Sequence, residues 1–158
     1  MLLCRFAFYS RRTWTASSGA DEDRYLADIL DAGLRNNPAH ALTGVLLVDG
    51  PHFVQVLEGA RAALYQTLKR IENNPHHGDL VLTGYAEVNQ RIFDRWSVYV
   101  RTPPGSLNGT PWIPNPQLAT HGQLVETAKR VSRMTTGVRQ ILPAGHAPGS
   151  DSSAPEKG

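Results

Sequence analysis

Four side chains with neutral hydrogen-bonding groups stand beside apolar segments of this sequence: Tyr9, Asn36, Asn37 and Gln55. A polar group buried without a partner costs roughly 1–3 kcal/mol, so each of them must find a hydrogen bond on folding. For any single residue, the simplest interpretation is a bond to the backbone or to another side chain. Together they indicate a ligand, because carboxamides supply the paired donors and acceptors that complement a heterocycle edge carrying carbonyl and NH groups.

The segments at the start of the chain predict where the first three of these residues lie. Residues 2–9 are aromatic and apolar, which predicts a strand that ends at Tyr9. After a polar loop, the acidic residues 21–23 favour a helix start, and apolar residues then recur at spacings of three and four. The proline of the segment 36–38 predicts the end of this helix, with both asparagines in its last turn.

The segment around Gln55 predicts a β-hairpin. Residues 42–48 and 52–57 are apolar runs, and Asp49-Gly50-Pro51 between them is typical of a turn. Because side chains alternate along a strand, Gln55 shares a face with Phe53 and is the polar side chain on an otherwise apolar face.

The rest of the chain completes a predicted α+β fold. A second helical stripe covers residues 60–71, and residues 79–88 and 95–101 predict two more strands. Two hairpins with two crossover helices indicate a ferredoxin-like sandwich, with a five-stranded mixed sheet and both helices on one face. The opposite face needs a cover, which we expect from C-terminal helices in this chain or from a partner.

Composition divides the chain beyond the predicted sheet. Residues 103–116 hold five prolines and predict a linker, whereas 118–142 predict one or two amphipathic helices. The last sixteen residues lack Leu, Ile, Val and aromatic residues, which predicts disorder. We therefore expect three parts: a domain at 1–101, a linker with a helical extension at 102–142, and a tail at 143–158.

Several chemistries are disfavoured. Cys4 is the only cysteine, and the six histidines show no chelating interval, so we expect no metal site and a reducing, cytoplasmic setting. A net charge of +2 argues against nonspecific nucleic-acid binding, and no apolar run approaches the ~20 residues of a membrane helix. Phosphate-loop, dinucleotide and nucleophile-elbow motifs are absent from the sequence, so we expect no enzyme.

Five groups of residues stand in order along the first 101 residues: Tyr9-Ser10-Arg11, Asn36-Asn37 with Leu42-Thr43-Gly44, Phe53-Val54-Gln55-Val56-Leu57-Glu58-Gly59, Arg70-Ile71 with His77, and Trp96-Ser97. In this order and spacing they resemble the BLUF domain, a family of blue-light sensors that use flavin. The loop before the first helix is a few residues longer than is usual in the family.

The resemblance implies a non-covalently bound flavin between the two helices, usually FAD, with FMN or riboflavin as alternatives. In the family, the residues at the positions of Asn36 and Asn37 bind this flavin, the second at the pyrimidine edge. By the same resemblance, the remaining cofactor-binding candidates are Tyr9, Phe53, Gln55, Arg70, His76 and His77.

The resemblance also implies a photochemical role for three residues. In the family, the excited flavin takes an electron from the tyrosine at the position of Tyr9, and a proton follows through the glutamine at the position of Gln55. The glutamine then rotates or tautomerises and makes a new hydrogen bond to the flavin. Trp96 belongs to a segment that is linked to carrying the signal out of the pocket.

This sequence departs from the family pattern at several positions. The family often has Ser at Gly33, Gly at Ala41, Asp at Asn74, Arg at His76 and Met at Val98. The arginine is thought to help hold the pyrimidine edge, so His76 bears on flavin affinity. Val98 lacks the flexible thioether of methionine, so we expect a different output or recovery rate.

The resemblance implies a short stand-alone sensor that acts through a separate protein partner. We expect homo-oligomers, no nucleic-acid partner and no membrane partner. The alternative is a BLUF-like protein-binding module that has lost its flavin. An unrelated ferredoxin-like protein, such as an acylphosphatase or an RNA-binding module, is a third reading, but the anion-binding arginine loop and the aromatic-basic motif they need are missing.

Overall fold

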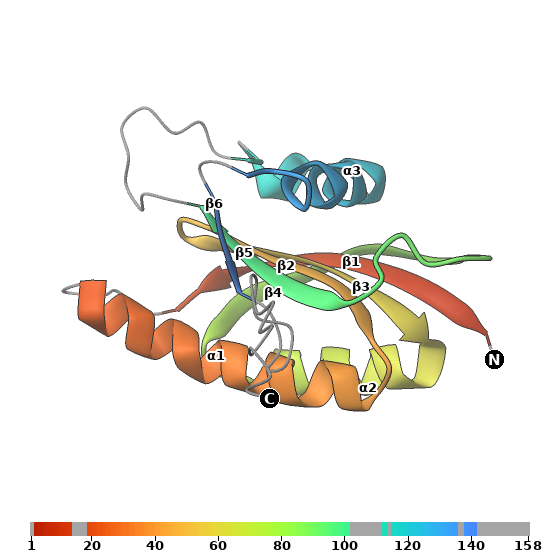
Figure 1. The fold of residues 1–158 in the computed structure, drawn as a ribbon, viewed down its shortest axis with the longest axis horizontal. Helices are drawn as coiled ribbons and strands as arrows, with labels where there is room; N and C mark the ends of the chain where they lie inside the picture. The colour runs from red at the N-terminus through yellow and green to blue at the C-terminus, as the bar shows by residue number, and fades with distance from the viewer. Residues whose placement is uncertain (1, 14–18, 102–111, 114, 136–137, 142–158) are drawn as a thin grey trace, which may run out of the picture.

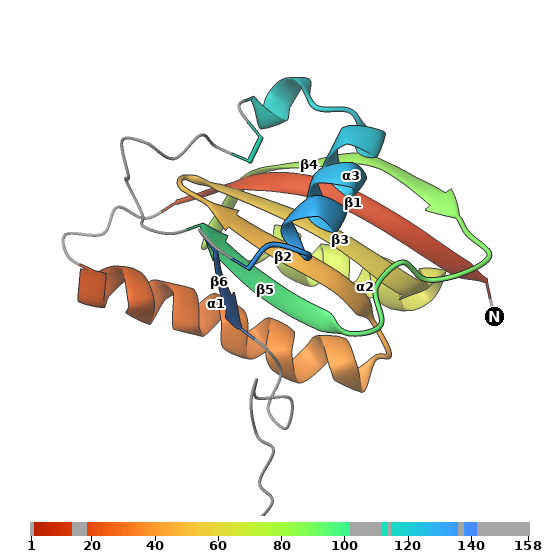
Figure 2. The same ribbon diagram turned by 45° about the horizontal axis from the view of Figure 1, so that its top comes forward.

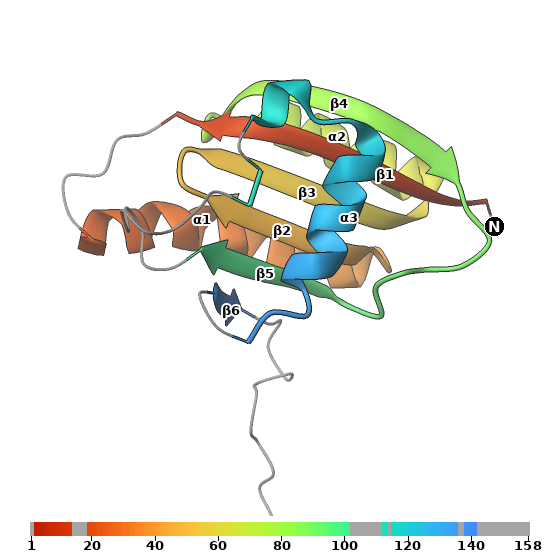
Figure 3. The ribbon, with the colours of Figure 1, turned by 90° about the horizontal axis from the view of Figure 1, so that it is seen from above.

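The computed structural model describes residues 2–13, 19–101, 112–113, 115–135 and 138–141. One mixed sheet of six strands runs through it, in the order β4-β1-β3-β2-β5-β6 (Figure 3). Neighbouring strands are antiparallel except β2 and β5, which are parallel. The strands are β1 (Leu3–Arg12), β2 (Thr43–Asp49), β3 (His52–Ala60), β4 (His77–Glu87), β5 (Trp96–Arg101) and β6 (Val138–Ile141).

Helices cover both faces of this sheet. Helices α1 (Gly19–Ala39) and α2 (Arg61–Glu72) lie side by side on one face, which we call the α1/α2 face (Figure 1). Helix α3 (His121–Val131) crosses the opposite face, the α3 face, after a 3₁₀ turn at Pro116–Leu118 (Figure 2). None of the described helices is both long and apolar enough to cross a membrane.

Each face has its own apolar core, because side chains alternate along the strands. On β1, Phe6 and Phe8 join the core beneath α1 and α2, whereas Ala7 and Tyr9 join the core beneath α3. Strands β1 and β3 pair in continuous register, with Phe8 opposite Gln55 and Tyr9 opposite Val54. This register decides which side chains of β1 can reach Gln55.

The predicted ferredoxin-like α+β sandwich is confirmed, with both early helices on one face and a C-terminal helix on the other. The predicted number of five strands is wrong, because the segment 118–142, expected to form one or two helices, holds the helix α3 and then the strand β6. Val138 and Ile141 have helical spacing, but four residues cannot distinguish the two periods. The otherwise unpaired edge of β5 supplies the hydrogen bonds that make this segment a strand.

The end of α1 also differs from the prediction. The helix continues through Pro38 to Ala39, because a proline in the last turn removes only one hydrogen bond near an end that already frays. The chain then leaves the helix through Ala41, whose φ of 55° lies in the left-handed region. This explains why glycine is favoured there in the resembling family, since a left-handed residue with a Cβ costs about 1–2 kcal/mol.

The predicted linker at 103–116 and the predicted disordered tail at 143–158 lie largely or wholly outside the described residues. Trp112 and Ile113 are described, and Asp49 accepts hydrogen bonds from their backbone N–H groups at 2.8 and 3.4 Å. Arg101 also pairs with Asp49. The turn between β2 and β3 is thereby tied to the segment that leads into α3.

Candidate functional site

A cavity of about 120 Å³ lies between α1, α2 and the sheet. Its walls are Ile29, Ala32, Gly33, Asn36 and Asn37 of α1; Leu46 of β2; Gln55 of β3; Thr67, Arg70 and Ile71 of α2; Asn74; His77 of β4; and Trp96 of β5. Helices and strands thus contribute both apolar walls and converging polar groups, which is the usual composition of a small-molecule site.

Four carboxamides line this cavity, those of Asn36, Asn37, Gln55 and Asn74. Asn37 and Gln55 are buried, with 3% and 5% of their surfaces exposed, and Asn36 is half-buried. Among the described residues, no side-chain hydrogen bond uses the carboxamides of Asn36, Asn37 and Gln55. A buried carboxamide without a partner is unfavourable, so a hydrogen bond from a ligand to Asn37 or Gln55 would stabilise the protein. Each group can both donate and accept, so the cavity can pair with a ligand edge that alternates carbonyl and NH groups.

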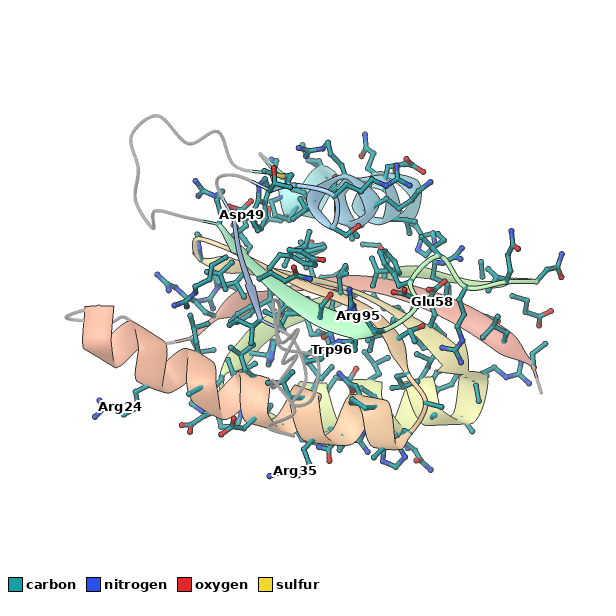
Figure 4. The ribbon with its side chains drawn as sticks, in the orientation of Figure 1. Arg24, Arg35, Asp49, Glu58, Arg95 and Trp96 are labelled. Carbon is teal, nitrogen blue, oxygen red and sulfur yellow. The ribbon has the colours of Figure 1, made fainter. Side chains whose placement is uncertain are left out.

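Trp96, the first residue of β5, supplies a further free donor. Its side chain lies between the sheet and the helices (Figure 4), and its Nε1 is buried without a hydrogen-bond partner. Its ring fills the space over Gly33 of α1: a Cβ there would lie 2.5 Å from Cη2 of the indole. The glycine at this position therefore makes room for the tryptophan.

His77 is held by Ser10 and Phe53. Its Nδ1 lies 2.7 Å from the hydroxyl oxygen of Ser10, and its ring centroid lies 4.8 Å from that of Phe53. Burial, and to a smaller extent the neighbouring His76, lowers the pKa of His77 from 6.5 to about 4. The imidazole is therefore neutral at pH 7, and its other ring nitrogen is left for a ligand.

Arg70 and Asn74 form the rim of the cavity. Arg70 is exposed, and its guanidinium donates to the hydroxyl of Thr67 at 2.8 Å. The side-chain oxygen of Asn74 accepts the backbone N–H of His76 at 2.9 Å. His76, a predicted cofactor-binding residue, is not among the residues that line the cavity.

The structure does not bring Tyr9 into this cavity. Tyr9 belongs to the core of the α3 face, with Val54 and Val56 of β3, and Phe8 is the residue of β1 opposite Gln55. The interpretation of Tyr9 as a partner of Gln55 is therefore wrong in this structure. The cause is the strand period of two, which sends adjacent side chains to opposite faces.

Of the remaining candidates, Asn36, Asn37, Gln55, Arg70, His77 and Trp96 line one cavity, and Phe53 supports it through His77. Sequence reasoning left out Ser10, Thr67 and Gly33 as site residues. Ser10 could have been found by counting two residues from Phe8 along the same strand face. Gly33 could have been found from its small size on the buried stripe of α1, where a bulky neighbour is expected.

No group of three or more His, Cys, Asp or Glu that could hold a metal occurs within the described ranges. The site is instead a cavity of neutral hydrogen-bonding groups between two helices and a sheet. Its class is thus that of an α+β domain with a ligand cavity that carboxamides and apolar side chains line.

The family model "Sensors of blue-light using FAD" matches residues 3–99, and this chain belongs to that family, the BLUF domains. BLUF domains bind flavin and sense blue light. The prediction that the matched domain is a sensor rather than an enzyme is confirmed by this match.

Relatives and solved structures agree with this assignment. The photoactivated adenylate cyclase subunit beta of Euglena gracilis is 25% identical over 120 residues, which cover 75% of this chain and only 13% of that protein. The dark-state structure of BlrB, a BLUF protein, is 25% identical with a TM-score of 0.55, covering 63% of this chain and 74% of that one. The ground state of BlsA has the same fold, with a TM-score of 0.68, 19% identity, and coverage of 84% and 89%.

Proposed function

We propose that this chain binds a flavin non-covalently in the cavity between α1 and α2 and responds to blue light. The observation that carries the proposal is the buried, unpartnered Nε1 of Trp96 in the same cavity as the Asn37 and Gln55 carboxamides. FAD is the flavin that the family description names, with FMN and riboflavin as alternatives.

The polar side chains of the cavity contact different parts of the flavin in this proposal. Asn36 and Asn37 both hold the flavin, with Asn37 at the pyrimidine edge, since its carboxamide offers a donor and an acceptor to the carbonyl and NH groups of that edge. Neutral His77, oriented by Ser10, adds one ring nitrogen without adding charge. Exposed Arg70 places a positive charge at the rim, where the charged part of a nucleotide flavin would leave the cavity.

The flavin supplies absorption of blue light and, once excited, a strong pull on an electron. Gln55 is the residue that changes its hydrogen bonds after light absorption, because rotation of its carboxamide exchanges a donor for an acceptor with no change in covalent structure. Tyr9 has no part in this proposal, since its side chain lies on the α3 face.

The cavity must widen to admit the whole ring system. A dry cavity of about 150 Å³ holds one benzene ring, and the cavity here is about 120 Å³. The Trp96 ring is wedged against Gly33 at the α1 wall, so an outward shift of α1 or of this ring is the simplest way to gain room.

We further propose that α3 passes the signal to a separate protein partner. Strand β3 carries Gln55 on the α1/α2 face, and its neighbours Val54 and Val56 pack beneath α3 with Leu124 and Ala128. A shift of β3 at Gln55 therefore changes the packing under α3. The partner and the number of chains in an assembly stay predictions from the resemblance.

The direct test is reconstitution of the purified full chain with FAD, FMN and riboflavin in turn, followed by absorption spectra in darkness and under blue light. We expect a yellow protein that retains flavin on gel filtration, and an Asn37→Leu variant that does not. A light-dependent and reversible change in the flavin spectrum supports the sensor. A folded but colourless chain that takes up none of the three contradicts the proposal and favours the flavin-free binding module.

A further inference from the structure

The oxidisable aromatic side chains are unevenly placed around the cavity. On β1, the residue opposite Gln55 is Phe8 of the α1/α2-face core, and a phenyl ring gives up an electron far less readily than a phenol or an indole. Tyr9 lies on the other side of the sheet. Among the described lining residues, Trp96 is the only side chain that is readily oxidised.

The packing of Trp96 fixes it in this wall. It is 2% exposed, and its six-membered ring lies where a side chain at residue 33 would begin, with Cη2 and Cζ2 2.5 and 2.9 Å from an ideal Cβ. Because Gly33 has no Cβ, the indole can enter the space beneath α1. The departure from the family pattern at Gly33 is thus matched to the position of Trp96.

The indole N–H of Trp96 also has no hydrogen-bond partner among the described residues. Its Nε1 is one of two buried side-chain nitrogen or oxygen atoms without a partner in the described part of the chain. An unsatisfied donor of this kind is costly in a folded protein, and a ligand that accepts from it recovers the cost.

We propose that Trp96 is the residue of this chain that donates a hydrogen bond to the bound flavin and that quenches its excited state by giving it one electron. This inference rests on the proposed flavin binding. Trp96 thereby takes the redox role that the resemblance assigns to a tyrosine, in a cavity that Tyr9 does not line.

The electron count is simple. The photoexcited flavin is the oxidant, the Trp96 indole is the reductant, and one electron passes from the indole. No bond forms or breaks in this step, and the electron returns to the indole in darkness. Gln55 shares the cavity with Trp96, so its carboxamide is exposed to the brief positive charge on the indole.

The test is the fluorescence lifetime and the affinity of bound FMN in the full chain, in the wild type and in three variants. Trp96→Phe removes both the donor and the reductant. We expect a lifetime several-fold longer than in the wild type, and binding about 2–10-fold weaker, which is the equivalent of one net hydrogen bond.

Two matched variants separate this role from packing. Trp112→Phe makes the same change in the α3-face core, and Tyr9→Phe removes the phenol hydroxyl of the tyrosine in that core. We expect both to keep the short lifetime of the wild type. A Trp96→Phe lifetime as short as the wild type, or a long lifetime in Tyr9→Phe, overturns the inference while leaving flavin binding intact.

Gly33→Ser gives a second, independent test, because a Cβ at this position forces the indole out of its seat. We expect a lengthened lifetime in this variant as well, and it decides the question if Trp96→Phe does not fold. Failure of the wild-type chain to bind FMN, FAD or riboflavin is a different result, which overturns the proposed function and this inference with it.

Discussion

The two faces of the sheet use polar side chains in opposite ways. On the α3 face, the carboxylate of Glu58 is fully buried and is saturated: it accepts from Arg5 at 2.7 Å and from the backbone N–H groups of Ile92 and Phe93 at 2.9 and 2.8 Å. On the α1/α2 face, Trp96 keeps an unpartnered N–H and Gln55 faces a cavity.

This difference separates polar groups that hold the fold from polar groups that await a ligand. Glu58 ties β1 and β3 to the segment that leads into Trp96, so its bonds serve stability. The α3 face has one exception, the buried Nδ1 of His121, whose pKa is lowered by burial and then by Arg5. That histidine is not among the residues that line the cavity of the α1/α2 face.

The largest effect is expected on the α3 face. Glu58→Ala leaves the Arg5 guanidinium and two backbone N–H groups without their acceptor, which should lower the free energy of unfolding by about 3–5 kcal/mol. Urea denaturation measures this loss, and Glu58→Gln, which keeps an acceptor oxygen, should lose less. A loss in Glu58→Ala below about 1 kcal/mol would show that this carboxylate does not hold the fold.

A somewhat smaller effect is expected from His77 as the pH falls. Its folded pKa is about 4 against 6.5 in the unfolded chain, so between these values the unfolded chain binds a proton that the folded chain does not. Stability is therefore full above pH 6.5 and falls as the pH drops towards 4, by on the order of 3 kcal/mol.

Urea denaturation at pH 7 and pH 4.5 measures this dependence. His77→Gln should show a smaller difference between the two pH values than the wild type, and His40→Gln, at an exposed residue, is the matched control. Equal pH dependence in His77→Gln and in the wild type would contradict the burial of a neutral imidazole in this wall.

The elements that carry three of the cavity residues could be predicted from the sequence. The hairpin around Gln55 and the placement of Asn36 and Asn37 followed from turn chemistry and helix periodicity, and the cavity contains all three. These signals are local, and a local signal is enough to place a residue on its own element.

The face of Tyr9 could not be predicted in the same way. Because residues 6–9 of β1 are apolar and buried on both faces of the sheet, alternation does not reveal which face meets α1 and α2. The register against β3 decides it, and that register is a long-range property. Likewise, β6 exists because β5 has a free edge, which no four-residue pattern discloses.

A moderate effect is expected for ligand binding on the α1/α2 face. Asn37→Leu removes one carboxamide from the wall and should weaken flavin binding by about tenfold or more, which corresponds to about 1.4 kcal/mol. Fluorescence titration with FMN measures the affinity. Unchanged binding in this variant, alongside weaker binding in Trp112→Phe, would move the ligand to the α3 face.

The smallest effect is expected for the stability of the flavin-free chain when Gln55 becomes Leu. Since no bond of the Gln55 carboxamide to another described residue is lost, the free energy of unfolding should change by less than about 1 kcal/mol. Urea denaturation without flavin measures it. A loss of unfolding free energy as large as that of Glu58→Ala would show that Gln55, like Glu58, stabilises the fold.

The central claim is that a flavin enters the α1/α2 face, and the indole N–H of Trp96 reports on it most directly. Nitrogen-15 NMR of the full chain during FMN addition, with indole signals assigned through Trp96→Phe and Trp112→Phe, follows both faces at once. We expect the Trp96 signal to shift with saturation while the Trp112 signal stays in place. A saturating shift of Trp112 alone, or no shift of Trp96 with flavin bound, would contradict the claim.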